Sequence, residues 1–219
     1  MLKKQVLLSF FIVFWIADVL MIYFNKHNLL PITRFLSLSS IVLYGYVAIK
    51  RITISFILLC VLIVSTGFLF SLNAYTISGL ISLCCLRAIW SILLLYQRPN
   101  RKDYKSIFII FGVLTCAISI VLYTMYVSTL FFYLSIFTTV SLMFLLAVSF
   151  ANILATGPKY GNLEMLLSVF IFVVSDSLSG AKKIEGTTTF YLMLSVLLYN
   201  LAYYFLMKSL IKHDKHLKH

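Results

Sequence analysis

The chain has 219 residues, of which 62% are hydrophobic and only 11% are charged. Soluble domains are about 45–50% apolar and about 25% charged, so this composition excludes a soluble globule. The formal net charge of +12 would suggest a nucleic-acid partner in a soluble protein. Here the basic residues flank long apolar runs, so a membrane surface accounts for the charge, and we expect no nucleic-acid partner.

Apolar runs long enough to cross a membrane follow one another along the whole chain. A spanning helix needs about 20 such residues, and the runs are continuous rather than alternating, which excludes transmembrane strands. We predict eight spans, at residues 5–24, 29–49, 52–72, 75–96, 106–125, 128–153, 163–181 and 187–207. The predicted fold is an all-α, polytopic integral membrane bundle, a single domain over residues 1–211 with a basic tail over 212–219. Seven spans is the alternative if the weak break near Tyr126 is absent.

The distribution of basic residues predicts the orientation. With eight spans and a cytoplasmic N-terminus, most lysines and arginines outside the apolar runs fall on the cytoplasmic side, whereas Lys26, Lys182 and Lys183 fall on the other. Such a bias obeys the positive-inside rule. Both termini are therefore expected in the cytoplasm. The bias, together with the lack of a transit peptide, favours a bacterial inner membrane.

Four ionisable residues lie inside the predicted spans: Asp18, Arg34, Arg87 and Asp176. Such residues are costly in a bilayer and are candidates for function. At about 1.5 Å of rise per residue, Asp18 and Asp176 lie roughly 20 Å above the starts of their spans, and Arg34 roughly 8 Å below the outer boundary. We expect these three to share a polar pocket in the outer half of the membrane, with Arg87 nearer the middle. The alternative is a buried ion pair that fixes helix register.

The surroundings of Asp176 are unusually rich in hydroxyls. The segment FVVSDSLSG places Ser175 directly before Asp176 and two further serines after it. Hydroxyls beside a carboxylate can orient it or hold a water, as a general acid or base requires. The last span adds Tyr199 and Asn200, with Tyr203 on the same helical face as Tyr199. These aromatic residues can equally serve packing.

No cofactor or metal is expected. The four cysteines fall inside apolar runs, and the four histidines lie at segment ends, so no pair has the spacing of metal ligands. The sequence also has no phosphate-binding loop, zincin or hydrolase-elbow motif.

Three segments resemble the YhhN family of eight-span membrane proteins, which includes the lysoplasmalogenases. The strongest is LLSVFIFVVSDSLSGAKKI (166–184), similar to a seventh span that ends in F-x-x-SD-x-L. It is followed by LSVLLYNLAYYFLMKSLI (194–211), similar to a Tyr-rich last span. Near the N-terminus, LLPITRFLSLSSIVLYGY (29–46) resembles the second span, in which a basic residue follows a Pro/Thr cluster, and Arg34 takes that place.

The resemblance implies hydrolysis of the vinyl-ether bond of a lysoplasmalogen or related lysolipid. That chemistry needs a proton donor and an activated water, which two membrane-embedded carboxylates can supply without a cofactor. It implies Asp176 as the acid/base, with Ser175 orienting it and Arg34 pairing with the lipid phosphate. Asp18, Arg87, Tyr199 and Asn200 complete the expected substrate site, and the expected partner is a membrane lipid of the lysophospholipid class; no oligomeric state follows from the sequence.

Two departures from the family pattern keep other functions open. The family has a Gly-Asp pair at the end of its third span, but GFLFSLNAYTISG (67–79) contains no acid, and Arg87 stands where the family has a His. A non-catalytic relative that binds a lipid or a membrane partner is therefore one alternative. A small-solute carrier is another, disfavoured by the absence of internal repeats and of spans broken by Gly or Pro.

Overall fold

A computed structural model of the chain describes residues 2–72, 76–96, 129–185 and 189–216, with positions 105, 107, 109 and 111–113; at some segment ends only the backbone is described. Every regular element in these ranges is helical. The elements are α1 (Leu2–Tyr23), the short 3-10 helix η1 (His27–Leu29), α2 (Leu30–Ala48), α3 (Ile54–Ser71), α4 (Thr76–Tyr96), α6 (Thr129–Thr156), α7 (Asn162–Glu185) and α8 (Thr189–His216).

Six helices in the described part of the chain are long and apolar enough to cross a membrane. They cover Lys3–Tyr23, His27–Ala48, Ile54–Ser71, Ile77–Leu95, Ile136–Thr156 and Thr189–His216. Helix α7 is not among these six; the side chains of its last seven residues lie outside the described part of the chain. The prediction of an all-helical, multi-pass membrane protein is confirmed at this level. Most of the predicted fifth span, 106–125, lies outside the described residues.

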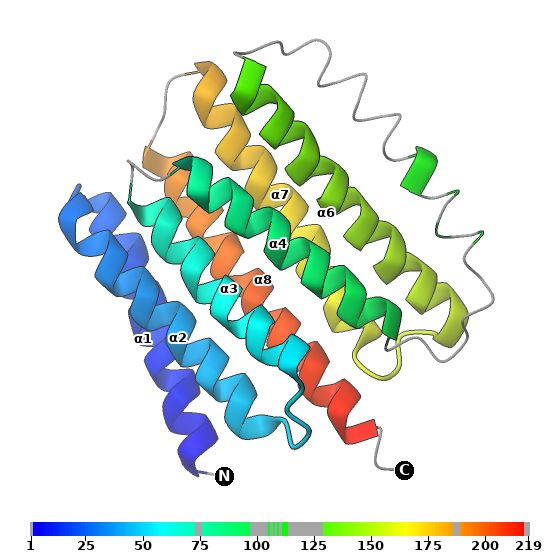
Figure 1. Cartoon of the computed structure of the whole chain (residues 1–219). Coiled ribbons are helices and arrows are strands. Elements are labelled where there is room, and N and C mark those ends of the chain that lie inside the picture. Colours follow the sequence, from blue (N-terminus) through cyan, green and yellow to red (C-terminus); the bar gives the residue numbers. More distant parts are fainter. Residues whose placement is uncertain are drawn as a thin grey trace.

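The helices pack side by side in one bundle (Figure 1). Helices that follow one another along the chain pack together, and α8 also contacts α1 and α2, which are distant from it in sequence. The first turn of α1 and the last turn of α8 lie at the same end of the bundle (Figure 1). Helix α4 ends at that end too, whereas α6 begins at the opposite end (Figure 1). Interhelical contacts to α8 therefore hold the N-terminal helices against the C-terminal ones.

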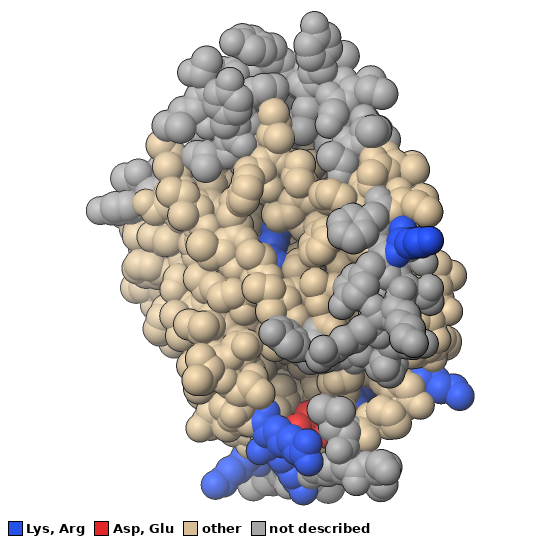
Figure 2. Space-filling model, turned by 45° about the vertical axis from the view of Figure 1, so that its right-hand side comes forward, with Lys and Arg blue, Asp and Glu red and all other residues tan. Residues whose placement is uncertain are grey.

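The outer surface of the bundle is apolar, as a lipid environment requires. On α1, for example, Val13 and Ile16 are more than half exposed, and the exposed fraction of Ile54 on α3 reaches 78%. Inside, Leu38, Leu59 and Ala147 are fully buried. A space-filling view shows this apolar surface, with basic side chains gathered at one end (Figure 2). Apolar groups on both the inside and the outside are typical of membrane bundles rather than of soluble ones.

Helix boundaries follow local sequence signals, with one clear difference from prediction. Pro31 lies in the first turn of α2, where its missing N–H costs nothing. The side chain of Thr53 caps α3 by accepting the backbone N–H of Phe56 at 3.2 Å. Helix α8 continues to His216, through the first five residues of the predicted tail. Those residues remain helical because they contact two other connections of the chain.

The turn between α6 and α7 depends on two glycines with left-handed backbone angles. Gly157 has a φ of +71° and Gly161 a φ of +91°. A side chain on Gly157 would meet no atom within 4 Å, whereas a Cβ on Gly161 would lie 2.5 Å from the backbone oxygen of Ser209 on α8. The Ser209 hydroxyl also donates to the Gly161 carbonyl at 2.7 Å. Gly161 is therefore where this turn touches α8.

We expect alanine at these two positions to separate backbone strain from steric overlap. Gly157→Ala should cost roughly 1–2 kcal/mol, because a left-handed angle is unfavourable for L-residues. Gly161→Ala should cost the same backbone strain. Its new methyl group would also overlap α8, which should add about 1–3 kcal/mol to the loss of stability. The measurement is the unfolding midpoint of each variant in detergent. Equal midpoints for the two variants would show that the turn does not press on α8.

Candidate functional site

The first intramembrane ion pair joins α1 to α2. Arg34 Nε donates to Asp18 Oδ2 at 3.1 Å, and the hydroxyl of Thr33 donates to the other carboxylate oxygen at 3.2 Å. The Asp18 side chain is fully buried, and that of Arg34 is 13% exposed. Because α1 and α2 are connected by a short turn, the late turns of α1 face the first turns of α2. Both oxygens of Asp18 thus have partners on α2.

The second ion pair joins α4 to α7 and also fastens α6. Arg87 on α4 donates through Nη2 to Asp176 Oδ2 on α7, and through Nη1 to the backbone carbonyl of Thr138 on α6 at 2.6 Å. The Arg87 side chain is only 2% exposed, but that of Asp176 is 31% exposed. The guanidinium is therefore inside the bundle and the carboxylate reaches its surface. Within the described part of the chain, Oδ1 of Asp176 has no hydrogen-bond partner.

Two tyrosines on α8 form a hydrogen-bonded pair. The Tyr203 hydroxyl donates to the Tyr199 hydroxyl at 2.9 Å, and the ring of Phe172 on α7 packs edge-on against both. Tyr203 is fully buried, whereas Tyr199 is half-buried. The electrostatic influence of Arg34, Arg87 and Asp176 extends to Tyr199, so members of both ion pairs lie in its wider surroundings.

The structure brings the predicted charges into one region but arranges them as two separate pairs. Asp18 contacts Arg34, and Asp176 contacts Arg87. Among the contacts of the described residues, none joins Asp176 directly to Asp18 or Arg34. Axial depth had grouped Asp176 with Arg34, but depth does not say which way a side chain points around its helix.

Two other residues of the expected site hold helices together. The Ser175 hydroxyl donates to the backbone carbonyl of Ser195 on α8 at 2.9 Å, so its described hydrogen bonds do not reach the Asp176 carboxylate. Asn200 is buried, accepts from the Ser37 hydroxyl at 3.0 Å and donates to the Val196 carbonyl. Arg87, rather than Ser175, orients Asp176.

The sequence did not reveal two of the partners in this region. Thr138 accepts the hydrogen bond of Arg87 through its backbone carbonyl. Any residue could supply that group, so the residue type at position 138 does not indicate the contact. Thr33 does carry a signal, since it immediately precedes Arg34 at the start of a predicted span.

The chemistry open to this region follows from its ion pairs. A carboxylate paired with an arginine is an anion, and an anion can accept a proton, activate a water or bind a cation. It does not donate a proton. Asp18 is enclosed, so Asp176 is the carboxylate that a ligand can reach.

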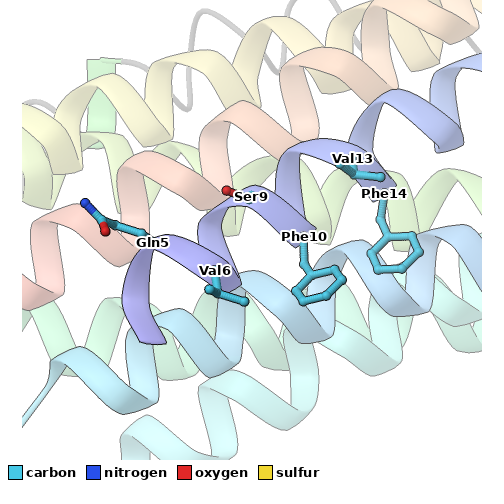
Figure 3. A pocket seen from close by; sticks show the side chains of 6 residues that line it. All are labelled: Gln5, Val6, Ser9, Phe10, Val13 and Phe14. Carbon is cyan, nitrogen blue, oxygen red and sulfur yellow. The ribbon is translucent and has the colours of Figure 1, made fainter. Parts of the chain in front are cut away.

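The described surface also has hollows. A shallow groove runs along α1 and is lined by Gln5, Val6, Ser9, Phe10, Val13 and Phe14. These side chains all project from one helix (Figure 3), and none carries a charge. Elsewhere, basic atoms are visible at the floor of a hollow in the apolar part of the surface (Figure 2). The groove on α1 suits contact with acyl chains, and it contains none of the ion-pair residues.

Comparison with known proteins finds no matching family model, no matching curated protein and no similar solved structure.

We expect the Asp18–Arg34 pair to behave as a coupled unit. Asp18→Asn or Arg34→Gln alone should destabilise the bundle by about 3–5 kcal/mol, because each leaves a buried charge without its partner. The double variant Asp18→Leu with Arg34→Met should recover most of this loss. Thr33→Val is the control and should cost only about 1 kcal/mol. Unfolding midpoints in detergent measure all four, and additive single losses in the double variant would contradict a coupled pair.

Proposed function

We propose that this protein binds a membrane lipid of the lysophospholipid class from within the bilayer, with the polar part of the lipid at Asp176. The observation that carries the proposal is the unequal exposure of the second ion pair: Arg87 is buried and Asp176 is 31% exposed. Arg87 pairs with one oxygen of this carboxylate, but a second carboxylate oxygen at the surface of an apolar bundle is costly unless it meets water or a ligand.

The contacts of Arg87 support Asp176 as the group that faces the ligand. Arg87 is held by the Thr138 carbonyl as well as by Asp176, so its position is fixed by three helices. Arg87 donates to only one carboxylate oxygen of Asp176, Oδ2. The other oxygen can accept a hydrogen bond from an ammonium or hydroxyl group of a lipid.

Tyr199 supplies a second polar group to the proposed site. Because Tyr203 donates to the Tyr199 oxygen, the proton of Tyr199 is available to another acceptor. Tyr199 is half-buried and within electrostatic range of Asp176. An amphiphile with both donor and acceptor groups near its single chain suits this pair of residues. The resemblance of 166–184 and 194–211 to the YhhN family supports the same class of lipid.

Hydrolysis of a lysoplasmalogen is a second candidate, favoured by the accessible carboxylate. Asp176 can accept a proton from the water that adds to the oxocarbenium ion. The resulting hemiacetal then breaks down to a fatty aldehyde and the glycerophospho head group. The first step, protonation of the vinyl ether, needs a separate acid, because Asp18 and Asp176 are both in ion pairs with arginines. For this reason the contacts favour lipid binding as the function. Hydrolysis of the bound lipid would require a separate acid in addition.

One set of assays tests both candidates. We expect Asp176→Asn to weaken binding of a fluorescent lysophospholipid by roughly 10- to 100-fold, the value of a hydrogen bond to a charged group. Ser177→Ala is the matched control, because Ser177 is exposed on the next position and bonds only to the Val173 carbonyl of its own helix. Aldehyde release from lysoplasmalogen, present in the wild type and lost in Asp176→Asn, would establish hydrolysis.

A further variant protects the test against misfolding. Asp176→Asn leaves Arg87 buried without a carboxylate, whereas Tyr199→Phe removes one hydroxyl and keeps both ion pairs. Tyr199→Phe should weaken lysophospholipid binding by about 5- to 10-fold, and it should cost about 1–3 kcal/mol of stability because the buried Tyr203 hydroxyl loses its acceptor. Unaltered binding in both variants would refute a site at Asp176.

We also propose eight spans with both termini in the cytoplasm. Helix α4 ends at the end of the bundle where α1 begins and α8 finishes, and α6 begins at the other (Figure 1). One more crossing between Tyr96 and Thr129 would make eight. The basic residues at the end shared by the termini support a cytoplasmic orientation through the positive-inside rule.

Reporter fusions check this topology. A fluorescent protein fused after His219 should be active, and alkaline phosphatase fused there should be inactive, because phosphatase folds only outside the cytoplasm. Phosphatase fused after residue 127 should be active if a fifth span precedes it. The opposite pattern at residue 127 would reduce the count to seven.

A further inference from the structure

The end of the bundle where α8 finishes is built around its last two turns. Asp214 is 7% exposed, and its two oxygens accept the backbone N–H groups of Lys50 at 2.9 Å and Arg51 at 3.2 Å. The ring of His216 stacks on that of Tyr160 with centroids 3.5 Å apart. The α2–α3 connection and the α6–α7 turn are therefore both attached to α8.

This end presents cations that no described carboxylate neutralises. Exposed basic side chains come from each of the three segments: Lys50, Arg51, Lys159 and Lys215. Figure 2 shows basic side chains gathered at this end of the molecule.

The carboxylates near this end are already engaged. Glu164 pairs with Lys212, and Asp214 gives both oxygens to backbone amides rather than to a cation. Among the described residues, no salt bridge reaches Lys50, Arg51, Lys159 or Lys215. No carboxylate in the described part of the chain balances the charge of these four residues.

Exposed apolar residues next to these cations indicate which anion balances them. Ile52 and Ile54 follow Arg51 and are 41% and 78% exposed, and Leu154, just before the α6–α7 turn, is 72% exposed. Side chains of this kind belong in hydrocarbon, so the cations lie where the hydrocarbon ends and lipid phosphates begin. A soluble polyanion would leave these apolar groups in water.

We propose that this end of the bundle is a binding site for anionic phospholipid head groups, formed by Lys50, Arg51, Lys159 and Lys215 and held in shape by Asp214. Asp214 accepts hydrogen bonds from the backbone N–H groups of Lys50 and Arg51, and this fixes the start of the α2–α3 connection. The side chains of Lys50 and Arg51 therefore extend from a rigid backbone. The site is separate from Asp176 and does not depend on the lysophospholipid proposal.

The first test compares two pairs of neutral substitutions at the same end of the molecule. In nanodiscs that contain phosphatidylglycerol, Lys50→Gln with Arg51→Gln should reduce retention of that lipid, measured by native mass spectrometry, by about fivefold per cation. Lys3→Gln with Lys4→Gln removes the same charge near the start of α1 and should have a much smaller effect. Equal losses in the two double variants would show general attraction and overturn the site.

The second test removes the charge of Asp214. Simple charge attraction and the geometry of the site predict opposite results for this variant. Asp214→Asn makes the chain more positive, so simple attraction would strengthen retention of phosphatidylglycerol. If the hydrogen bonds to Asp214 hold the site in shape, retention of phosphatidylglycerol should instead fall severalfold while the unfolding midpoint stays above the assay temperature. Increased retention would overturn the proposal, as would equally strong binding of soluble inositol hexakisphosphate in detergent without lipid. Should Asp214→Asn fail to fold, the two double variants still decide.

Discussion

The fold depends on how much it costs to hold a charge away from water. Arg87 is almost completely buried in an apolar bundle, and a guanidinium there requires acceptors from the protein itself. It obtains them from α6 and α7, while its own helix is α4. One side chain thus fixes the relative positions of three helices. Asp18 imposes the same requirement on α1 and α2, with Thr33 and Arg34 meeting it.

The serines and asparagines of the interior extend this logic to uncharged groups. Ser168 donates to the Ala202 carbonyl at 2.7 Å, Ser175 to the Ser195 carbonyl, and Ser37 to Asn200. All three bonds join another helix to α8. Since lipid offers no hydrophobic force between helices, close packing and such bonds are what hold a membrane bundle together. Two of the polar residues that first suggested chemistry, Ser175 and Asn200, thus connect other helices to α8. Asp176 differs from them because one of its oxygens has no described partner.

The sequence predicted much of the fold because apolar run length corresponds directly to membrane thickness. It located each described helix to within a few residues, apart from the end of α8, where Asp214 and His216 find partners that hydropathy cannot anticipate. Charged residues inside spans were equally visible. Their pairing was not, because position along a helix axis gives depth but not direction, so Asp176 was grouped with Arg34 instead of Arg87. The Thr138 carbonyl could not be foreseen from any side chain.

The position of α8 has a consequence for how the protein is made. Helix α8 leaves the ribosome after the other described helices, yet it contacts α1, α2 and α7. The Asp18–Arg34 pair joins neighbours in sequence and can form as soon as α2 has entered the membrane. The charges of α1 and α2 can therefore be paired early, whereas the Ser37 hydroxyl remains without Asn200 until α8 has been made. The bundle is complete only once α8 has entered the membrane. A chain that stops before α8 would expose the faces of α1, α2 and α7 that α8 covers, and membrane quality-control proteases would then have access to them.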